Sequence, residues 1–218
     1  MKNDKYDSES EKRCIVLANG DFPKSEKLLT LLRQTKNIIV CDGAVGKLLS
    51  FGLEPTSIVG DLDSLNPQLR ERFQDRVHKV SDQETNDLTK AVYFAHQSDF
   101  TDVSILGATG LREDHTIGNI SLLLEYAPLF NRVEILTDFG RFLPVLSSSV
   151  FACQKGQQIS IFSLNPEAEL SAEGLLYPIF HRCFTSWWEG TLNEAIGESF
   201  SLTLSANSRL ILYFCDRP

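Results

Sequence analysis

The sequence lacks three features that would each define a class of protein: a long apolar run, closely spaced cysteines and a surplus of basic residues. No stretch approaches the roughly 18 apolar residues of a membrane-spanning helix, so we expect no membrane association. The first 13 residues are polar and of mixed charge, without the apolar core of a signal peptide. We expect a frayed tail there.

The cysteines are scattered along the chain. They never form a CxxC pair, which argues against a disulfide framework and against a zinc site. Most lie in apolar, strand-like segments, so we expect buried, reduced thiols and a cytoplasmic location. The five are Cys14, Cys41, Cys153, Cys183 and Cys215.

The net charge of −8 argues against a basic surface dense enough to follow a nucleic-acid backbone, so we expect no nucleic-acid partner. An acidic protein that binds a polyphosphate needs a bridging cation. The hydrophobic content of 42% and the charged content of 23% are typical of a globular protein. A length of 218 residues allows one large domain or two small ones.

Short apolar segments alternate with amphipathic ones over the first two-thirds of the chain. Apolar residues recur at the spacing of one helix face over residues 88–95 and again over residues 117–124. Strands separated by such helices predict βαβ units and a parallel sheet. The expected strands are residues 14–18, 38–40, 57–59, 77–80, 103–106 and 133–137.

After about residue 144 the helical period is lost, and β-rich segments are separated by turn residues. This pattern is typical of a small antiparallel sandwich. The segments are residues 149–153, 158–162, 200–204 and 209–214. The sequence thus predicts an α/β plus all-β protein, with a Rossmann-like parallel-sheet domain over residues 1–143 and an antiparallel β-sandwich over residues 144–218.

Asp61 and Asp63 follow the expected strand 57–59 and are separated by one residue. Because a strand points alternate residues to the same side, such a pair can direct two carboxylates at one point, as a Mg²⁺ site requires. The same Asp-x-Asp-Ser pattern is also common in turns and helix caps. The pair alone leaves both interpretations open.

Other polar residues fall at the same edge of the expected sheet. Asp42 follows the second strand, Gln83 follows the fourth, and Asp87 lies in the first turn of the next helix. In an open α/β sheet this carboxyl edge binds ligands. Several carboxylates there would repel one another unless a cation neutralised them, so we favour a metal site over isolated helix caps.

A glycine-rich segment, Gly107-Ala108-Thr109-Gly110, follows the fifth strand. Its backbone N–H groups would approach a phosphate at the start of the next helix, although it is neither a P-loop nor GxGxxG. Arg112 strengthens the phosphate interpretation because guanidinium groups bind phosphates through two hydrogen bonds. For His115, both contact with a ligand and packing at the start of the helix are compatible with the sequence.

Four segments resemble the thiamine pyrophosphokinase (thiamine diphosphokinase) family, in the family's order and spacing. They are CDGA at 41–44, VGDLDSL at 59–65, DQETNDLTKA at 82–91 and GATGLREDH at 107–115. GLLYP at 174–178 and GTLN at 190–193 resemble C-terminal elements of the family. The similarity therefore extends over nearly the whole chain.

The resemblance implies an enzyme that transfers pyrophosphate from ATP to the hydroxyl of thiamine and releases AMP, with Mg²⁺ as its cofactor. It also implies a homodimer with thiamine bound between the subunits. By position, the catalytic metal and phosphate cluster corresponds to Asp42, Asp61, Asp63 and Asp87. The expected ATP- and phosphate-binding residues are Gln83, Gly107, Thr109, Gly110 and Arg112. Asp114 corresponds to a catalytic position near thiamine, where it either orients the substrate or accepts its hydroxyl proton.

Asn193, Tyr177, Trp187 and Trp188 are candidates for the thiamine pocket, in addition to Asp114. An aromatic pair in a sandwich is, however, more often part of the core or of a dimer interface. The chain departs from the family pattern here, since Leu192 stands where the family places Ser and Tyr177 replaces a common Trp. Asn86 replaces a Thr and keeps a polar helix cap.

Two other function classes are compatible with the residues. A Mg²⁺-dependent phosphohydrolase with an aspartyl nucleophile also carries DxD at a strand end, although that class has the pair after its first strand and this chain has it after the third expected strand. A nucleotide- or thiamine-binding sensor without turnover is the non-enzymatic alternative, although binding a neutral hydroxyl ligand requires no acidic cluster.

Overall fold

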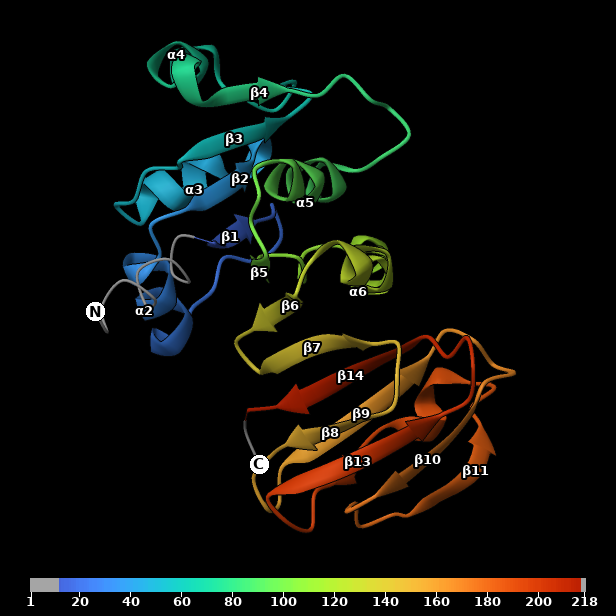
Figure 1. Cartoon of the computed structure of the whole chain (residues 1–218). Helices are drawn as coiled ribbons and strands as arrows, with labels where there is room; N and C mark the ends of the chain where they lie inside the picture. The colour runs from blue at the N-terminus through green and yellow to red at the C-terminus, as the bar shows by residue number, and fades with distance from the viewer. Residues whose placement is uncertain (1–11, 217–218) are drawn as a thin grey trace, which may run out of the picture. The chain divides into compact units, whose positions relative to one another are not determined.

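Strand β1 (Arg13–Leu17) lies inside a parallel sheet in the computed structural model of the chain, which describes residues 12–216 (Figure 1). The other strands of this sheet are β2 (Ile38–Cys41), β3 (Ser57–Gly60), β4 (Val77–Lys79), β5 (Asp102–Leu106) and β6 (Arg132–Thr137). Their order is β6-β5-β1-β2-β3-β4, and each neighbouring pair is parallel. All the strands predicted for this region are confirmed to within one residue at either end.

Helices cover both faces of this sheet. Leu28 of α2 (Glu26–Gln34) and Leu48 of α3 (Val45–Ser50) pack in one core with Ile15 of β1. Helix α5 (Asp87–Gln97) contacts β1, β2 and β3, and Figure 1 shows it on the other side of the sheet. Because both faces are covered, β1 and β2 are buried almost without alternation. The remaining helical elements before β6 are α4 (Pro67–Arg72), α6 (Glu113–Tyr126) and the 3₁₀ helices η1 (Asp42–Ala44), η2 (Gln74–Arg76) and η3 (Ala127–Leu129). The two helical patterns of the sequence fall within α5 and α6.

The order of the strands reverses at β1. From β1 the chain adds β2, β3 and β4 on one side, and it then places β5 against the other side of β1, followed by β6. A reversal of this kind is where open parallel sheets bind ligands, at the carboxyl ends of the strands.

The C-terminal strands form two antiparallel sheets. These strands are β7 (Gly140–Val145), β8 (Ser149–Ala152), β9 (Gln158–Ser163), β10 (Glu169–Glu173), β11 (Ile179–Cys183), β12 (Asn193–Glu194), β13 (Ser199–Leu204) and β14 (Leu210–Cys215). One antiparallel layer has the order β12-β9-β14-β7, and the other is a four-stranded sheet with the order β11-β10-β13-β8. Apolar residues of both sheets, such as Ile161, Leu212 and Phe200, share one core. The predicted antiparallel sandwich is confirmed.

The chain divides into two compact units, with the main boundary between residues 138 and 139. Unit 1 contains residues 12–122 and 128–138, and unit 2 contains residues 123–127 and 139–216. The boundary expected at residue 143 lies inside β7, which belongs wholly to unit 2. The frayed tail expected over residues 1–13 lies outside the described residues, apart from Lys12 and from Arg13, which begins β1.

All five cysteines are free, but the expectation that most are buried is wrong. Cys14 and Cys41 are buried in the parallel sheet, whereas Cys153, Cys183 and Cys215 are half-buried or exposed in unit 2. Cys183 lies in β11, which has one buried residue in five, whereas Cys153 follows β8 and packs against the core of the sandwich. Burial and the charge of Asp102 raise the pKa of Cys14 to about 12, so this thiol stays protonated at neutral pH.

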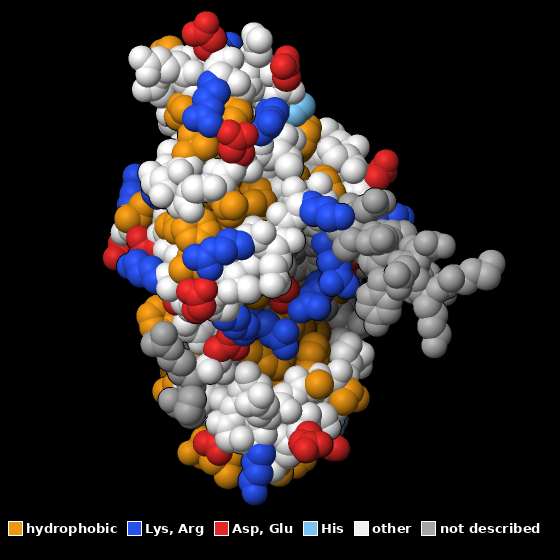
Figure 2. Space-filling model, turned by 90° about the vertical axis from the view of Figure 1, so that its left-hand side faces the viewer, with side chains coloured by type: hydrophobic (Ala, Val, Ile, Leu, Met, Phe, Trp, Pro, Cys, Tyr) orange, Lys and Arg blue, Asp and Glu red, His pale blue; other side chains and the backbone are white. Residues whose placement is uncertain are grey.

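The surface carries charges of both signs. Figure 2 shows one face on which Lys and Arg side chains lie among Asp and Glu, with apolar side chains between them. Among residues 12–216, no helix has the length and apolar character needed to cross a membrane.

Candidate active site

A cavity of about 460 Å³ opens at the carboxyl end of the sheet in unit 1. Its walls come from the turns after β1, β2, β3 and β5 and from the start of α5. The cavity therefore lies at the switch point of the strand order, where open parallel sheets bind ligands. The structure brings together at this cavity Asp42, Asp61, Gln83, Asp87, Gly110, Arg112 and His115. The predicted site residues of unit 1 that do not line it are Asp63, Gly107, Thr109 and Asp114.

Asp42 joins the ends of two strands. It follows β2 directly, is buried, and accepts a hydrogen bond at Oδ2 from the backbone N–H of Leu62 (2.9 Å). Gly60 permits this close approach, because a Cβ at that position would lie 2.6 Å from the Asp42 Cγ. Burial, followed by the charges of Asp87 and Asp61, raises the pKa of Asp42. A cation beside these carboxylates would relieve their repulsion.

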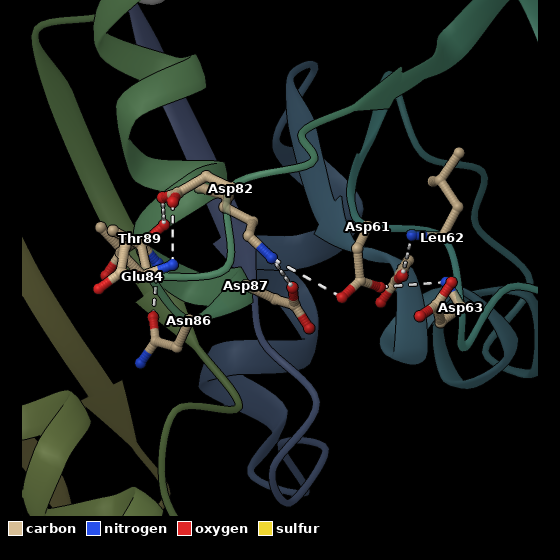
Figure 3. A network of polar contacts seen from close by, with 11 residues as sticks. Asp61, Leu62, Asp63, Asp82, Glu84, Asn86, Asp87 and Thr89 are labelled. Atoms are coloured by element: carbon tan, nitrogen blue, oxygen red, sulfur yellow. Dashed lines mark hydrogen bonds and ion pairs between the residues drawn. The ribbon is translucent and has the colours of Figure 1, made fainter.

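The segment Asp61-Leu62-Asp63 turns after β3 ends at Gly60. Leu62 has a φ of 72°, in the left-handed region that leucine seldom adopts, and its side chain is buried. Because the backbone is no longer extended, strand alternation does not set the direction of the two carboxylates. Asp61 lines the cavity and accepts a hydrogen bond from the N–H of Asp63 (3.1 Å), whereas the Asp63 side chain is exposed outside the lining (Figure 3).

Helix α5 presents Asp87 to the cavity. The helix is capped by Asn86, whose Oδ1 accepts the N–H of Thr89 (2.8 Å), so the polar cap expected at this position is confirmed. One turn into the helix, Lys90 is buried against the carboxylates. Its Nζ lies 3.1 Å from Asp87 Oδ1 and 3.8 Å from Asp61 Oδ2.

Within residues 12–216, no group of three or more His, Cys, Asp or Glu side chains is arranged to hold a metal ion. The donor chemistry of the cavity nevertheless fits Mg²⁺, because Asp42, Asp61 and Asp87 all line it and carboxylate oxygens are the ligands that this ion prefers. In this structure Lys90 supplies the positive charge beside two of them.

The loops after β1 and β5 are joined by backbone hydrogen bonds. The N–H of Gly20 donates to the Gly107 carbonyl (2.7 Å), and the N–H of Asp21 donates to the Thr109 carbonyl (2.8 Å). A Cβ on Gly20 would lie 2.4 Å from both carbonyl oxygens, so only glycine fits there. Gly107 and Thr109 therefore hold the glycine-rich loop in place, while Gly110 lines the cavity.

Asn119 of α6 connects this loop to α5. Its Nδ2 donates to the Ala108 carbonyl (2.8 Å), and its Oδ1 accepts the Asn86 Nδ2 (3.2 Å). All three residues line the cavity. No sequence pattern marks Asn119, because its partners are a backbone carbonyl and a distant amide. Lys90 was also missed, although a lysine three residues after an aspartate on a helix signals a contact.

Arg112 lines the cavity and forms an ion pair with Asp114. The Nε–Oδ1 distance is 3.0 Å and the Nη2–Oδ2 distance is 2.5 Å. These hydrogen bonds, with one from the N–H of His115, lower the pKa of Asp114 to about 2. Asp114 is therefore a fully charged carboxylate at neutral pH.

The predicted thiamine residues of the C-terminal region lie in unit 2. The Asn193 amide is buried and braces the backbone of Tyr177, accepting its N–H (3.0 Å) and donating to its carbonyl (2.8 Å). The Tyr177 side chain is 63% exposed. Trp187 stands edge-on to Phe162, with ring centroids 6.2 Å apart. Leu192 is exposed and has a φ of 59°.

The parallel sheet, its switch-point cavity and the separate sandwich define a ligand-binding α/β protein with an added β unit. Comparison with known proteins identifies the family. Residues 28–137 match the thiamin pyrophosphokinase catalytic domain, and residues 140–213 match the thiamin pyrophosphokinase substrate-binding domain. The chain belongs to the thiamin pyrophosphokinase family.

Relatives and solved structures agree with this assignment. The chain is 31% identical to thiamin pyrophosphokinase 1 of Caenorhabditis elegans and 28% identical to thiamine pyrophosphokinase of Bacillus subtilis, over 61% of its length in both cases. The alignments span 58% and 65% of those relatives, less than two-thirds of either.

The crystal structure of the Bacillus subtilis protein has a similar fold, with a TM-score of 0.75, 20% identity, and coverage of 94% of this chain and 99% of that one. Thiamin pyrophosphokinase from Candida albicans also has a TM-score of 0.75, at 16% identity, with coverage of 95% and 91%.

Proposed function

We propose that this chain transfers a pyrophosphoryl group from ATP to the hydroxyl of thiamine, giving thiamine diphosphate and AMP. The observation that carries the proposal is the switch-point cavity, lined by Asp42, Asp61, Asp87 and Arg112. Carboxylates suit a metal-bound polyphosphate, and a guanidinium suits its oxygens. Family membership and the names of the relatives support thiamine as the acceptor.

In this reaction the thiamine hydroxyl oxygen attacks the β-phosphorus of ATP. The bond from that phosphorus to the oxygen bridging to the α-phosphate breaks, AMP leaves, and the hydroxyl proton passes to solvent. Transfers of this kind depend mainly on positioning and electrostatic stabilisation. The residues of the cavity therefore act by holding charge and geometry.

Asp42, Asp61 and Asp87 would hold Mg²⁺, which when bound neutralises negative charge on the polyphosphate. Asp42 is positioned for this by its hydrogen bond from the Leu62 N–H. Asp63 contributes through its backbone N–H, which orients the Asp61 carboxylate.

Arg112, Gln83 and the backbone around Gly110 would bind the polyphosphate of ATP, since all three line the cavity. Gly107 and Thr109 support them by holding the loop against the β1 loop. For Asp114 we favour an orienting role toward thiamine over proton acceptance, because a carboxylate with a pKa of about 2 is a weak base.

We also propose a homodimer in which the second copy covers apolar side chains of unit 2 and thiamine binds at the subunit interface. Large contiguous patches of exposed apolar side chains are uncommon on monomeric proteins. Those between residues 176 and 192 are Leu176, Tyr177, Phe180, Trp187, Trp188 and Leu192. Tyr177 and Trp187 would contribute aromatic surface to thiamine, with Asn193 holding the Tyr177 backbone. The free cysteines support a cytoplasmic location.

A coupled assay tests the function. The protein is mixed with thiamine and Mg²⁺-ATP, and AMP and thiamine diphosphate are measured together. Equal amounts of both products, lost on omission of thiamine or Mg²⁺, are expected. Orthophosphate release without transfer would instead identify a phosphohydrolase, and thiamine binding by calorimetry without AMP would identify a sensor.

A further inference from the structure

The side chain of Lys90 is 4% exposed, which is unusual for a lysine. It projects from α5 one turn after Asp87 into the acidic cavity. Its ammonium group contacts two carboxylates from different elements, Asp87 on the same helix and Asp61 after β3. Figure 3 labels these two aspartates, Asp61 and Asp87, among the side chains drawn.

A buried ammonium group needs anionic partners, because removing it from water is costly unless it is paired. Asp61 and Asp87 are the carboxylates within 4 Å of Lys90 among the described residues. These are also two of the carboxylates that would hold Mg²⁺. A divalent ion that binds the protein alone must therefore compete with an ammonium group that is already held by the same two carboxylates.

We propose that Lys90 is the internal counter-ion of the cavity, which keeps divalent cations from binding tightly until the polyphosphate arrives with them. This inference rests on the proposed function. With Mg²⁺ alone, two cations share the same carboxylates. A metal–nucleotide complex is anionic as a whole, so it offers the ammonium group new partners in the phosphate oxygens. Metal and nucleotide are thus taken up together.

The test is a titration with Mn²⁺, a paramagnetic ion that suits the same oxygen ligands as Mg²⁺. Free Mn²⁺ is followed by electron paramagnetic resonance with the full chain, first without nucleotide. In Lys90→Met the Kd for Mn²⁺ should fall by about tenfold or more, because a repelling charge next to the site is removed. Lys90→Arg keeps the charge and should retain the weak binding of the wild type.

Adding a non-hydrolysable ATP analogue should reverse the order, with the Mn²⁺ held by the analogue alone measured in a protein-free titration and subtracted. The wild type should then bind Mn²⁺ more tightly than Lys90→Met, because the variant has no ammonium group to pair with phosphate oxygens. Lys79→Met removes an exposed lysine of β4 in the same unit and should change neither titration. Lys90→Gln provides the same comparison if Lys90→Met does not fold, as judged by circular dichroism.

A folded, uncharged variant with Mn²⁺ affinity equal to or weaker than that of the wild type, without nucleotide, would overturn the inference, because a merely structural lysine gives that result. If this inference about Lys90 fails but the wild type binds Mn²⁺ with the analogue present, the proposal that Asp42, Asp61 and Asp87 hold Mg²⁺ still stands. Absence of Mn²⁺ binding with and without the analogue would overturn both.

Discussion

The guanidinium of Arg112 and the carboxylate of Asp114 face each other at the start of α6 through two hydrogen bonds, of 3.0 and 2.5 Å. Both side chains are more than half exposed. A phosphate that binds Arg112 must therefore share or replace this carboxylate partner. The pair joins a cavity residue to one outside the lining, and it determines the charge state of Asp114.

We expect Asp114 to contribute no inflection to the pH dependence of kcat/KM between about pH 5 and 9. Its pKa in the folded protein, about 2, is below the unfolded value of about 3.9. At a pH above the unfolded pKa, the charged Asp114 therefore contributes to the stability of the folded protein. This contribution to stability is lost only as the pH falls through the folded pKa. Asp114→Asn should lower kcat/KM by about tenfold or more at every pH in that window. A shifted acidic limb in the variant would identify Asp114 as the titrating base instead.

The two aspartates around Leu62 should differ in importance. Asp61→Asn should reduce kcat on the order of 100-fold, the scale of a lost electrostatic stabiliser, because its carboxylate lines the cavity. Asp63→Asn should cost less than about tenfold, since its backbone N–H to Asp61 is retained. Steady-state kinetics of both variants checks this. Equal losses would mean that both carboxylates hold the metal.

Gly60→Ala should destabilise the protein by about 2 kcal/mol or more, because its Cβ would lie 2.6 Å from the Asp42 Cγ. Gly46→Ala is the matched control. It lies in α3 with nothing within 4 Å of the new Cβ, so it should stabilise by about 0.5–1 kcal/mol. Urea unfolding measures both, and a neutral Gly60→Ala would show that Asp42 is not held as described.

Asn119→Ala should raise the KM for ATP by about threefold to tenfold, since it removes both hydrogen bonds that connect α5 to the glycine-rich loop. Ser121→Ala on the same helix removes only a local hydrogen bond to Gly118. It should leave the KM unchanged. If both variants lower the melting temperature and neither changes the KM, Asn119 serves stability alone.

Asp138 directly follows β6, and its side chain stabilises the start of α2. Its carboxylate accepts the backbone N–H groups of Lys24 and Ser25. Burial raises its pKa, but these hydrogen bonds outweigh it and lower the pKa overall. Asp138→Ala should therefore cost about 1.5–3 kcal/mol at pH 7. The difference from wild type should shrink as the pH falls below about 3.9, because the stabilising charge is lost by protonation. Urea unfolding at pH 7 and at low pH tests this; a pH-independent difference would contradict it.

The parallel sheet was predictable because its central strands β1 and β2 are almost wholly apolar and because the segments that became α5 and α6 have clear helical periodicity. The sandwich was predictable only in part. Strand β11 has one buried residue in five, and its pairing with β10 is interrupted by a bulge, so neither periodicity nor hydrophobicity marks it. Strand β12 has only two residues.

The general observation that open α/β sheets bind ligands at the carboxyl ends of their strands was sufficient to predict that Asp42, Asp61 and Asp87 lie at one cavity. The alternation of side chains along a strand ends with the strand, at Gly60. Because Leu62 has a left-handed backbone conformation, the side chains of Asp61 and Asp63 do not point in the same direction. The spacing of Lys90 after Asp87 indicates a contact between them, but its burial is not evident in the sequence because a lysine on a helix is ordinarily solvated.

The reversal of strand order at β1 also has a consequence for biosynthesis. Paired residues of β1 and β5, such as Cys14 and Val103, are 89 positions apart. A nascent chain that has emerged only as far as α5 thus carries the acidic wall of the cavity without the opposite wall, which follows β5. A ligand can bind the complete cavity only after β5 has paired with β1, and contacts between residues so far apart in sequence form slowly during folding. A ligand that binds only the completed cavity therefore stabilises the folded chain and none of its shorter precursors.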